Sequence, residues 1–111
     1  MPGFLFMKEN LFSIPDKLNK EFENFISLLD DEKILIEKII SNGQKTPENQ
    51  WLEQERNEWV VLIQGEAEIR FDDGEVKILK SGDYINILSN KKHRVEKTST
   101  DPVCIWLAVH Y

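Results

Sequence analysis

The sequence predicts a single all-β domain, a sandwich or barrel, preceded by a short lead-in that contains one helix. From residue 33 onward, short segments rich in branched and aromatic residues alternate with turn signals. These turns recur about every 8–12 residues, which is typical of sandwiches and barrels. The chain has 111 residues and shows no linker, repeat or low-complexity stretch, so we expect one compact domain.

The lead-in is predicted to form a helix over residues 17–29. Pro15 and Asp16 are favourable residues for a first helical turn. The apolar residues that follow recur at helical spacing: Leu18, Phe22, Phe25, Ile26 and Leu29. Such a stripe would pack against the outside of a sheet. We therefore assign residues 1–32 to the lead-in and residues 33–111 to the barrel.

The rest of the chain is predicted to consist of strands joined by turns. The predicted strands are residues 33–41, 59–63, 66–71, 75–79, 84–88, 94–96 and 103–110. Residues 66–71 alternate strictly between apolar and charged side chains, as a half-buried strand does. The turn Asp72-Asp73-Gly74 then closes a hairpin, in whose second strand we expect Val76 and Ile78 to face inward.

Charge and cysteine content exclude several classes of protein. The chain carries 14 Lys and Arg against 20 Asp and Glu, a net charge of −6, so it lacks the basic face that nucleic acids and anionic membranes attract. No apolar run approaches the ~20 residues that span a bilayer, and the apolar start lacks the basic region of a secretory signal. Cys104 is the single cysteine, so no internal disulfide forms. We expect a cytoplasmic protein that binds neither nucleic acid nor membrane.

Two segments that begin or end at glycine carry the clearest motif signal. In the first, Gly65 follows Glu58 after seven residues, and the second runs from Gly82 to His93. Their spacing resembles the two motifs of the cupin superfamily, and the surrounding sequence is similar to small single-domain bacterial cupins of the cupin 2 type, a branch without a settled activity. The resemblance covers about residue 33 to residue 111 and implies a double-stranded β-helix, or jelly-roll barrel; the helix predicted for residues 17–29 lies outside the resemblance and would pack on the outside of the barrel.

The resemblance also implies a degenerate metal site. Metal-binding cupins hold one divalent ion with three histidines and a glutamate, whereas here only Glu58 and His93 match those positions. The histidine pair of the first motif is absent, and Gln54 stands at one of its places with an amide that binds first-row metals more weakly than imidazole. A zinc, iron, nickel or manganese ion would then depend on Gln54, Glu58 and His93, with His110 as a further candidate.

Each candidate residue also has a purely structural interpretation. Glu58 would be hydrated or paired with a cation at the barrel mouth, because an unpartnered buried carboxylate is costly. His93 follows two lysines and suits a surface loop as well as a site, and His110 suits a core or rim position. Trp51 suits the core as well as a pocket wall.

Three functions are compatible with these residues. The first is a cupin that binds a small molecule at the barrel mouth, in a pocket formed by Trp51, Gln54, Glu58 and His93, and the missing histidine pair favours it. The alternative is a metal-dependent dioxygenase or isomerase acting on a small polar organic substrate, and a metal-free epimerase or lyase would use His93 as general base. Residues 33–41 would leave an exposed isoleucine-rich edge strand, so we also expect a homodimer.

Overall fold

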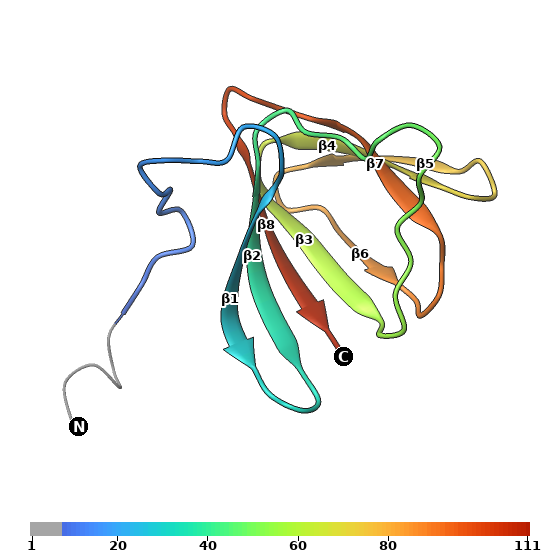
Figure 1. Ribbon diagram of the computed structural model, residues 1–111, viewed down its shortest axis with the longest axis horizontal. Coiled ribbons are helices and arrows are strands. Elements are labelled where there is room, and N and C mark those ends of the chain that lie inside the picture. The colour runs from blue at the N-terminus through green and yellow to red at the C-terminus, as the bar shows by residue number, and fades with distance from the viewer. Residues whose placement is uncertain (1–7) are drawn as a thin grey trace.

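The computed structural model describes residues 8–111, which form two antiparallel β-sheets (Figure 1). The strands are β1 (Asn24–Asp30), β2 (Leu35–Ser41), β3 (Glu58–Gln64), β4 (Glu66–Phe71), β5 (Val76–Lys80), β6 (Tyr84–Ile87), β7 (His93–Thr98) and β8 (Cys104–His110). The larger sheet has the order β1-β2-β8-β3-β6 and the smaller sheet has the order β5-β4-β7. No helix occurs over these residues, so none of them forms a membrane-spanning helix.

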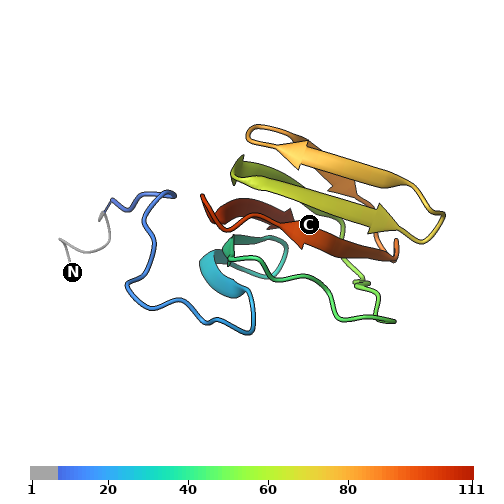
Figure 2. The same ribbon diagram turned by 90° about the horizontal axis from the view of Figure 1, so that it is seen from above.

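The two sheets pack face to face around one apolar core (Figures 1 and 2). Both sheets contribute buried side chains to it: Ile39, Val60, Leu62, Ala67, Ile69, Leu79, Ile87, Cys104, Trp106 and Ala108. The alternation predicted for residues 66–71 is confirmed, because Ala67 and Ile69 are buried while Glu66 and Arg70 are exposed. The all-β prediction is therefore confirmed.

The chain passes from the larger sheet to the smaller one at Gly65. Its φ is +99°, a conformation that L side chains rarely adopt. A Cβ atom here would lie 2.8 Å from Ser99 Oγ and 2.9 Å from Cys104 Sγ. Only glycine fits at this crossing, and this explains why the first motif ends with a glycine.

The hairpin between β4 and β5 forms as predicted, but two of its side chains face the other way. Val76 pairs with Arg70 and Ile78 pairs with Glu68, so both apolar side chains share the outer face of the sheet with charged residues. Ile78 is accordingly 68% exposed, and Leu79 faces the core instead. The inward orientation expected for Val76 and Ile78 is wrong, because the three-residue turn sets a register that the apolar pattern alone does not reveal.

The helix predicted for residues 17–29 is also wrong. Its second half is strand β1, which pairs antiparallel with β2 from Asn24 opposite Ile40 to Asp30 opposite Leu35. Before β1, the side-chain oxygen of Asn19 accepts the backbone N–H groups of Glu21 and Phe22 at 2.9 and 3.1 Å. Local bonds of this kind stabilise a turn at the expense of a helix. Strand β2 thus gains a partner on the side that the sequence left unpaired.

Candidate functional site

A cavity of about 240 Å³ opens between the two sheets. Its apolar wall comes from both sheets and consists mainly of Ile39, Val60, Ile69, Ile87, Val95 and Trp106. Its polar side chains are Glu23, Glu37, Glu53, Gln54, Glu58, His93 and His110. Phe25 and Leu52 also line it, and both are substantially exposed, at 61% and 42%, so they form the rim. The cavity therefore combines a largely apolar wall with four carboxylate side chains.

Three of the four predicted pocket residues meet in this cavity. Glu58 is the first residue of β3, and Gln54 lies in the loop just before it. The amide Nε2 of Gln54 donates to Glu58 Oε1 at 2.7 Å. His93, the first residue of β7, lines the same cavity from the smaller sheet. The two motifs thus contribute side chains to one site from opposite sheets.

The ring of His93 is held in a defined orientation. Its Nδ1 lies 2.9 Å from the backbone carbonyl of Lys91, and because a carbonyl only accepts, Nδ1 carries the proton. When the ring is neutral, the lone pair is then on Nε2. This atom has no hydrogen-bond partner among residues 8–111. His93 is 5% exposed, so it belongs to the cavity wall and not to a surface loop.

His110 is paired with a carboxylate from the neighbouring strand. Its Nε2 lies 2.8 Å from Glu37 Oε1, and the two side chains are only 9% and 14% exposed. The pairing follows from the register of β2 and β8, in which Glu37 is opposite Ala108, two residues from His110 on the same face. His110 therefore uses one ring nitrogen within the protein.

Glu23 reaches the cavity from the segment just before β1. The indole N–H of Trp106 donates to Ser41 Oγ at 3.0 Å, and the Ser41 hydroxyl donates in turn to the Glu23 carboxylate. Burial raises the pKa of Glu23 above its ordinary value, the Ser41 bond lowers it, and the nearby charge of Glu58 raises it further. Two carboxyl groups of the cavity thus influence each other electrostatically.

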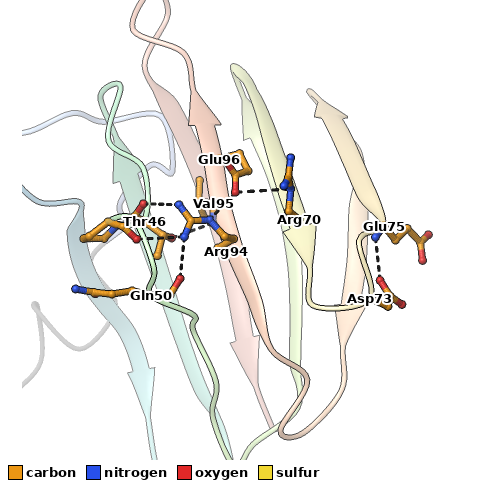
Figure 3. A network of polar contacts seen from close by, with 9 residues as sticks. Thr46, Gln50, Arg70, Asp73, Glu75, Arg94, Val95 and Glu96 are labelled. Atoms are coloured by element: carbon orange, nitrogen blue, oxygen red, sulfur yellow. Dashed lines mark hydrogen bonds and ion pairs between the residues drawn. The ribbon is translucent and has the colours of Figure 1, made fainter.

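The loop that carries Gln54 is bound to the smaller sheet by Arg94 (Figure 3). We call residues 42–57 the β2–β3 loop. The Arg94 guanidinium donates to the carbonyls of Thr46 at 2.9 Å, Pro47 at 3.2 Å and Gln50 at 2.9 Å. Further along this loop, Leu52 exchanges two backbone hydrogen bonds with His93, at 2.7 and 3.1 Å. These bonds set the position of the loop over the cavity.

Trp51 is the one predicted pocket residue that the structure does not place at the cavity. Its side chain is 42% exposed, and Arg94 lies over its ring at 5.9 Å from the centroid. Trp51 is therefore neither a core residue nor a pocket wall. It covers the guanidinium that holds the β2–β3 loop.

The residues present do not fit the metal centre that the family pattern implies. Among residues 8–111, no three His, Cys, Asp or Glu side chains converge closely enough to hold an ion. His110 is paired with Glu37, and Gln54 directs its amide nitrogen toward Glu58. Glu58 and His93 remain as the two candidate donors.

Three carboxylates of the cavity were missed by sequence reasoning. Glu37 could have been found, because alternation along residues 33–41 places it on the same face as Ile39. Glu53 directly precedes Gln54, which the first motif indicated, but it is not one of the predicted pocket residues. Nothing in the sequence indicated Glu23 as a site residue, because it lies within the predicted helix of residues 17–29.

The chain folds into two antiparallel sheets that face each other. The cavity between them is lined by Glu58 of the first motif and His93 of the second. This architecture is that of the double-stranded β-helix class. The chain belongs to the cupin family, since the family model described as "Cupin domain" matches residues 39–110. Among proteins with curated functions, none matches the sequence.

Solved structures agree with this assignment. A "putative mannose-6-phosphate isomerase" from Ralstonia eutropha JMP134 is 33% identical, with a TM-score of 0.85, over 94% of this chain and 96% of that one. A protein with a double-stranded β-helix domain from Klebsiella pneumoniae is 19% identical, with a TM-score of 0.74, over 93% and 87% of the two chains. A cupin superfamily protein from Desulfitobacterium hafniense is 17% identical, with a TM-score of 0.70, over 85% and 81%. The last two similarities show the fold alone.

Proposed function

We propose that this cupin binds a small molecule in the cavity between its sheets, with Gln54, Glu58 and His93 as contacting residues. The proposal depends on one observation: His93 is buried in the cavity wall, yet its Nε2 has no partner in the described part of the chain. A ligand that donates a hydrogen bond would supply that partner. The cavity volume of about 240 Å³ is below the range typical of drug-sized ligands, so the ligand is small.

The name of the Ralstonia protein refers to a phosphorylated sugar, and we do not extend that substrate to this chain. Phosphate groups are bound by arginine, lysine or helix N-termini. Over residues 8–111 the cavity is lined by four glutamates and by no lysine or arginine. A phosphate would therefore meet negative charge without a compensating cation.

The binding proposal is tested by a thermal-shift screen of sugars, organic acids, amines and nucleobases, followed by titration calorimetry of each hit. A ligand at about 100 times its Kd stabilises the folded state by about 2.7 kcal/mol. We expect Glu58→Gln to weaken binding, and Glu66→Gln, an exposed position on β4, to leave it unchanged. Hits that bind equally to Glu58→Gln would place the ligand elsewhere.

The alternative is a metal-dependent enzyme, a dioxygenase or isomerase, and the observation that favours it is that Glu58 and the unpaired Nε2 of His93 line the same cavity. Two donors are fewer than the three protein ligands usual in catalytic zinc sites, so a zinc, iron, nickel or manganese ion would need a further donor beside Glu58 and His93. Elemental analysis of protein purified without added metal tests this. Near-stoichiometric metal that disappears in Glu58→Ala would support the enzyme, and less than about a tenth of an equivalent would reject it.

We also propose that the protein acts in the cytoplasm. Its one cysteine, Cys104, is buried and unpaired in the structure, so the fold makes no use of an oxidising environment. Fractionation of the native host, with the protein detected by antibody, is the measurement that checks this location.

A further inference from the structure

We propose that the ligand of this cavity is a small organic cation, an amine with a hydrocarbon body. This inference depends on the small-molecule-binding function proposed above and specifies the chemistry of its ligand. Three features of the cavity carry it: the charge of its wall, the hydrogen-bonding character of its polar groups, and the spacing of its carboxylates.

The wall of the cavity carries negative charge without a matching positive charge. Glu58 receives a hydrogen bond from the neutral amide of Gln54, and Glu23 receives one from the neutral hydroxyl of Ser41. Two basic side chains near His93 in the sequence are used elsewhere, because Arg94 of β7 bonds the β2–β3 loop and Lys91, which precedes β7, pairs with Asp72 at 3.0 Å. Within the described residues, the one basic side chain in the wall with an acidic partner is His110, bonded to Glu37.

The polar groups available to a ligand are mainly acceptors. Glu23 and Glu58 present carboxylate oxygens, and because Nδ1 of His93 faces the Lys91 carbonyl, its Nε2 is the ring atom left for a ligand. An ammonium group has three donors and no acceptor, so it complements this set directly. A bound cation would also relieve the repulsion between Glu23 and Glu58 and lower the raised pKa of Glu23.

The spacing of the carboxylates suits an organic cation better than a metal ion. A first-row metal needs its ligands at about 2.0–2.2 Å from one point. No three acidic or histidine side chains of residues 8–111 meet that requirement. Ammonium groups bind oxygens at about 2.7–2.9 Å, which allows a wider arrangement. The apolar wall of Ile39, Val60 and Ile69 then receives a hydrocarbon body, which no metal ion would use.

The test uses the full chain and probes that share one carbon skeleton: pentylamine, 1-pentanol and pentanoate, with manganese chloride and zinc chloride as separate arms. Calorimetry at constant ionic strength should show that pentylamine binds and that the alcohol and the carboxylate do not. Glu58→Gln should weaken amine binding by about tenfold or more, since it removes a charge-assisted hydrogen bond.

Controls separate this site from general attraction of amines to an acidic protein. Glu66→Gln removes the same charge from an exposed position and should leave pentylamine binding unchanged. Thermal unfolding of Glu58→Gln without ligand should show that the variant is folded. Equal weakening in both variants would mean that the amine binds to net charge, and the inference would then be rejected.

The remaining outcomes also decide between the two proposals. If pentanol or pentanoate binds better than pentylamine and Glu58→Gln still weakens that binding, the cavity is a binding site but not for cations. Stoichiometric metal binding without amine binding overturns the inference in favour of the metal alternative. If no probe binds and the broader screen also finds no ligand, both proposals fail.

Discussion

Glu23 is the residue whose ionisation the fold disfavours most clearly. Burial raises its pKa above the ordinary value of 4.5, the Ser41 bond opposes this shift, and the charge of Glu58 adds to it. The folded protein therefore holds this proton more tightly than the unfolded chain does. The resulting stability is fully present below pH 4.5 and is lost as the pH rises through the raised pKa.

Glu23→Gln should consequently stabilise the protein at neutral pH. Glutamine keeps an oxygen that accepts from Ser41 Oγ and never ionises, so the melting temperature should rise by several degrees at about pH 7.5. At about pH 3.5 the variant and the parent should melt together. Thermal unfolding across this pH range measures the effect, and a gain of equal size at every pH would contradict the explanation.

The ring of His93 makes a structural bond through Nδ1 and carries, in Nε2, the atom that we propose contacts the ligand, and the two roles can be separated. His93→Asn retains an N–H donor near the position of Nδ1, able to reach the Lys91 carbonyl, and removes Nε2. We expect this variant to lose ligand binding by about tenfold or more while unfolding within about 1 kcal/mol of the parent. Calorimetry and denaturant unfolding measure the two quantities. Unchanged binding would show that Nε2 does not contact the ligand.

At the level of elements, the β2–β3 loop depends on Arg94 for its position over the cavity. Arg94→Lys keeps the charge but loses the planar group that donates to three carbonyls at once. We expect a loss of about 1–3 kcal/mol in the free energy of unfolding. Hydrogen exchange at the amides of Leu52 and His93 should become faster, because their mutual bonds hold the same loop. An exchange rate equal to that of the parent would show that the loop is held by other contacts.

Most strands could be predicted because their signals are local. Strand β4 has the predicted bounds, and the predicted segments elsewhere differ from the observed strands by a few residues at their ends. Strand β1 could not be predicted, because its apolar residues fit a helix and its true conformation depends on pairing with β2. Short apolar segments are ambiguous in this way until a partner strand is known.

The candidate site, like the strands, could be predicted only where the signal was local in the sequence. Glu58 and His93 follow from motif spacing, and the cavity contains both. Glu23 was not predictable, since its place depends on the register that brings Ser41 and Trp106 beside it. Trp51 was given a pocket role because aromatic residues often line binding sites, whereas the structure shows it against Arg94.

For the whole molecule, the homodimer stays a prediction, but the strand that would mediate it changes. Strand β2 lies between β1 and β8, so the edge strand on this side of the larger sheet is β1. Leu28 and Leu29 on β1 are 40% and 48% exposed, and exposed apolar edge strands tend to associate. We expect size-exclusion chromatography with light scattering to show a dimer.

A matched pair of variants tests that interface. Leu28→Lys places a charge on the edge and should shift the protein toward monomer. Leu88→Lys, at a loop position that is 61% exposed, should not. A parent protein that is monomeric at high micromolar concentration would remove the prediction.

The segment before residue 39 bears on how ligand specificity could change in evolution. Glu23 and Glu37 precede residue 39, where the family match begins, yet both reach the cavity. If the cavity binds a ligand, part of its selectivity would then be encoded outside the matched residues, by the segment before β1 and by the start of β2. Substitutions at Glu23 and Glu37 are therefore a natural place to begin redesign of the cavity's charge.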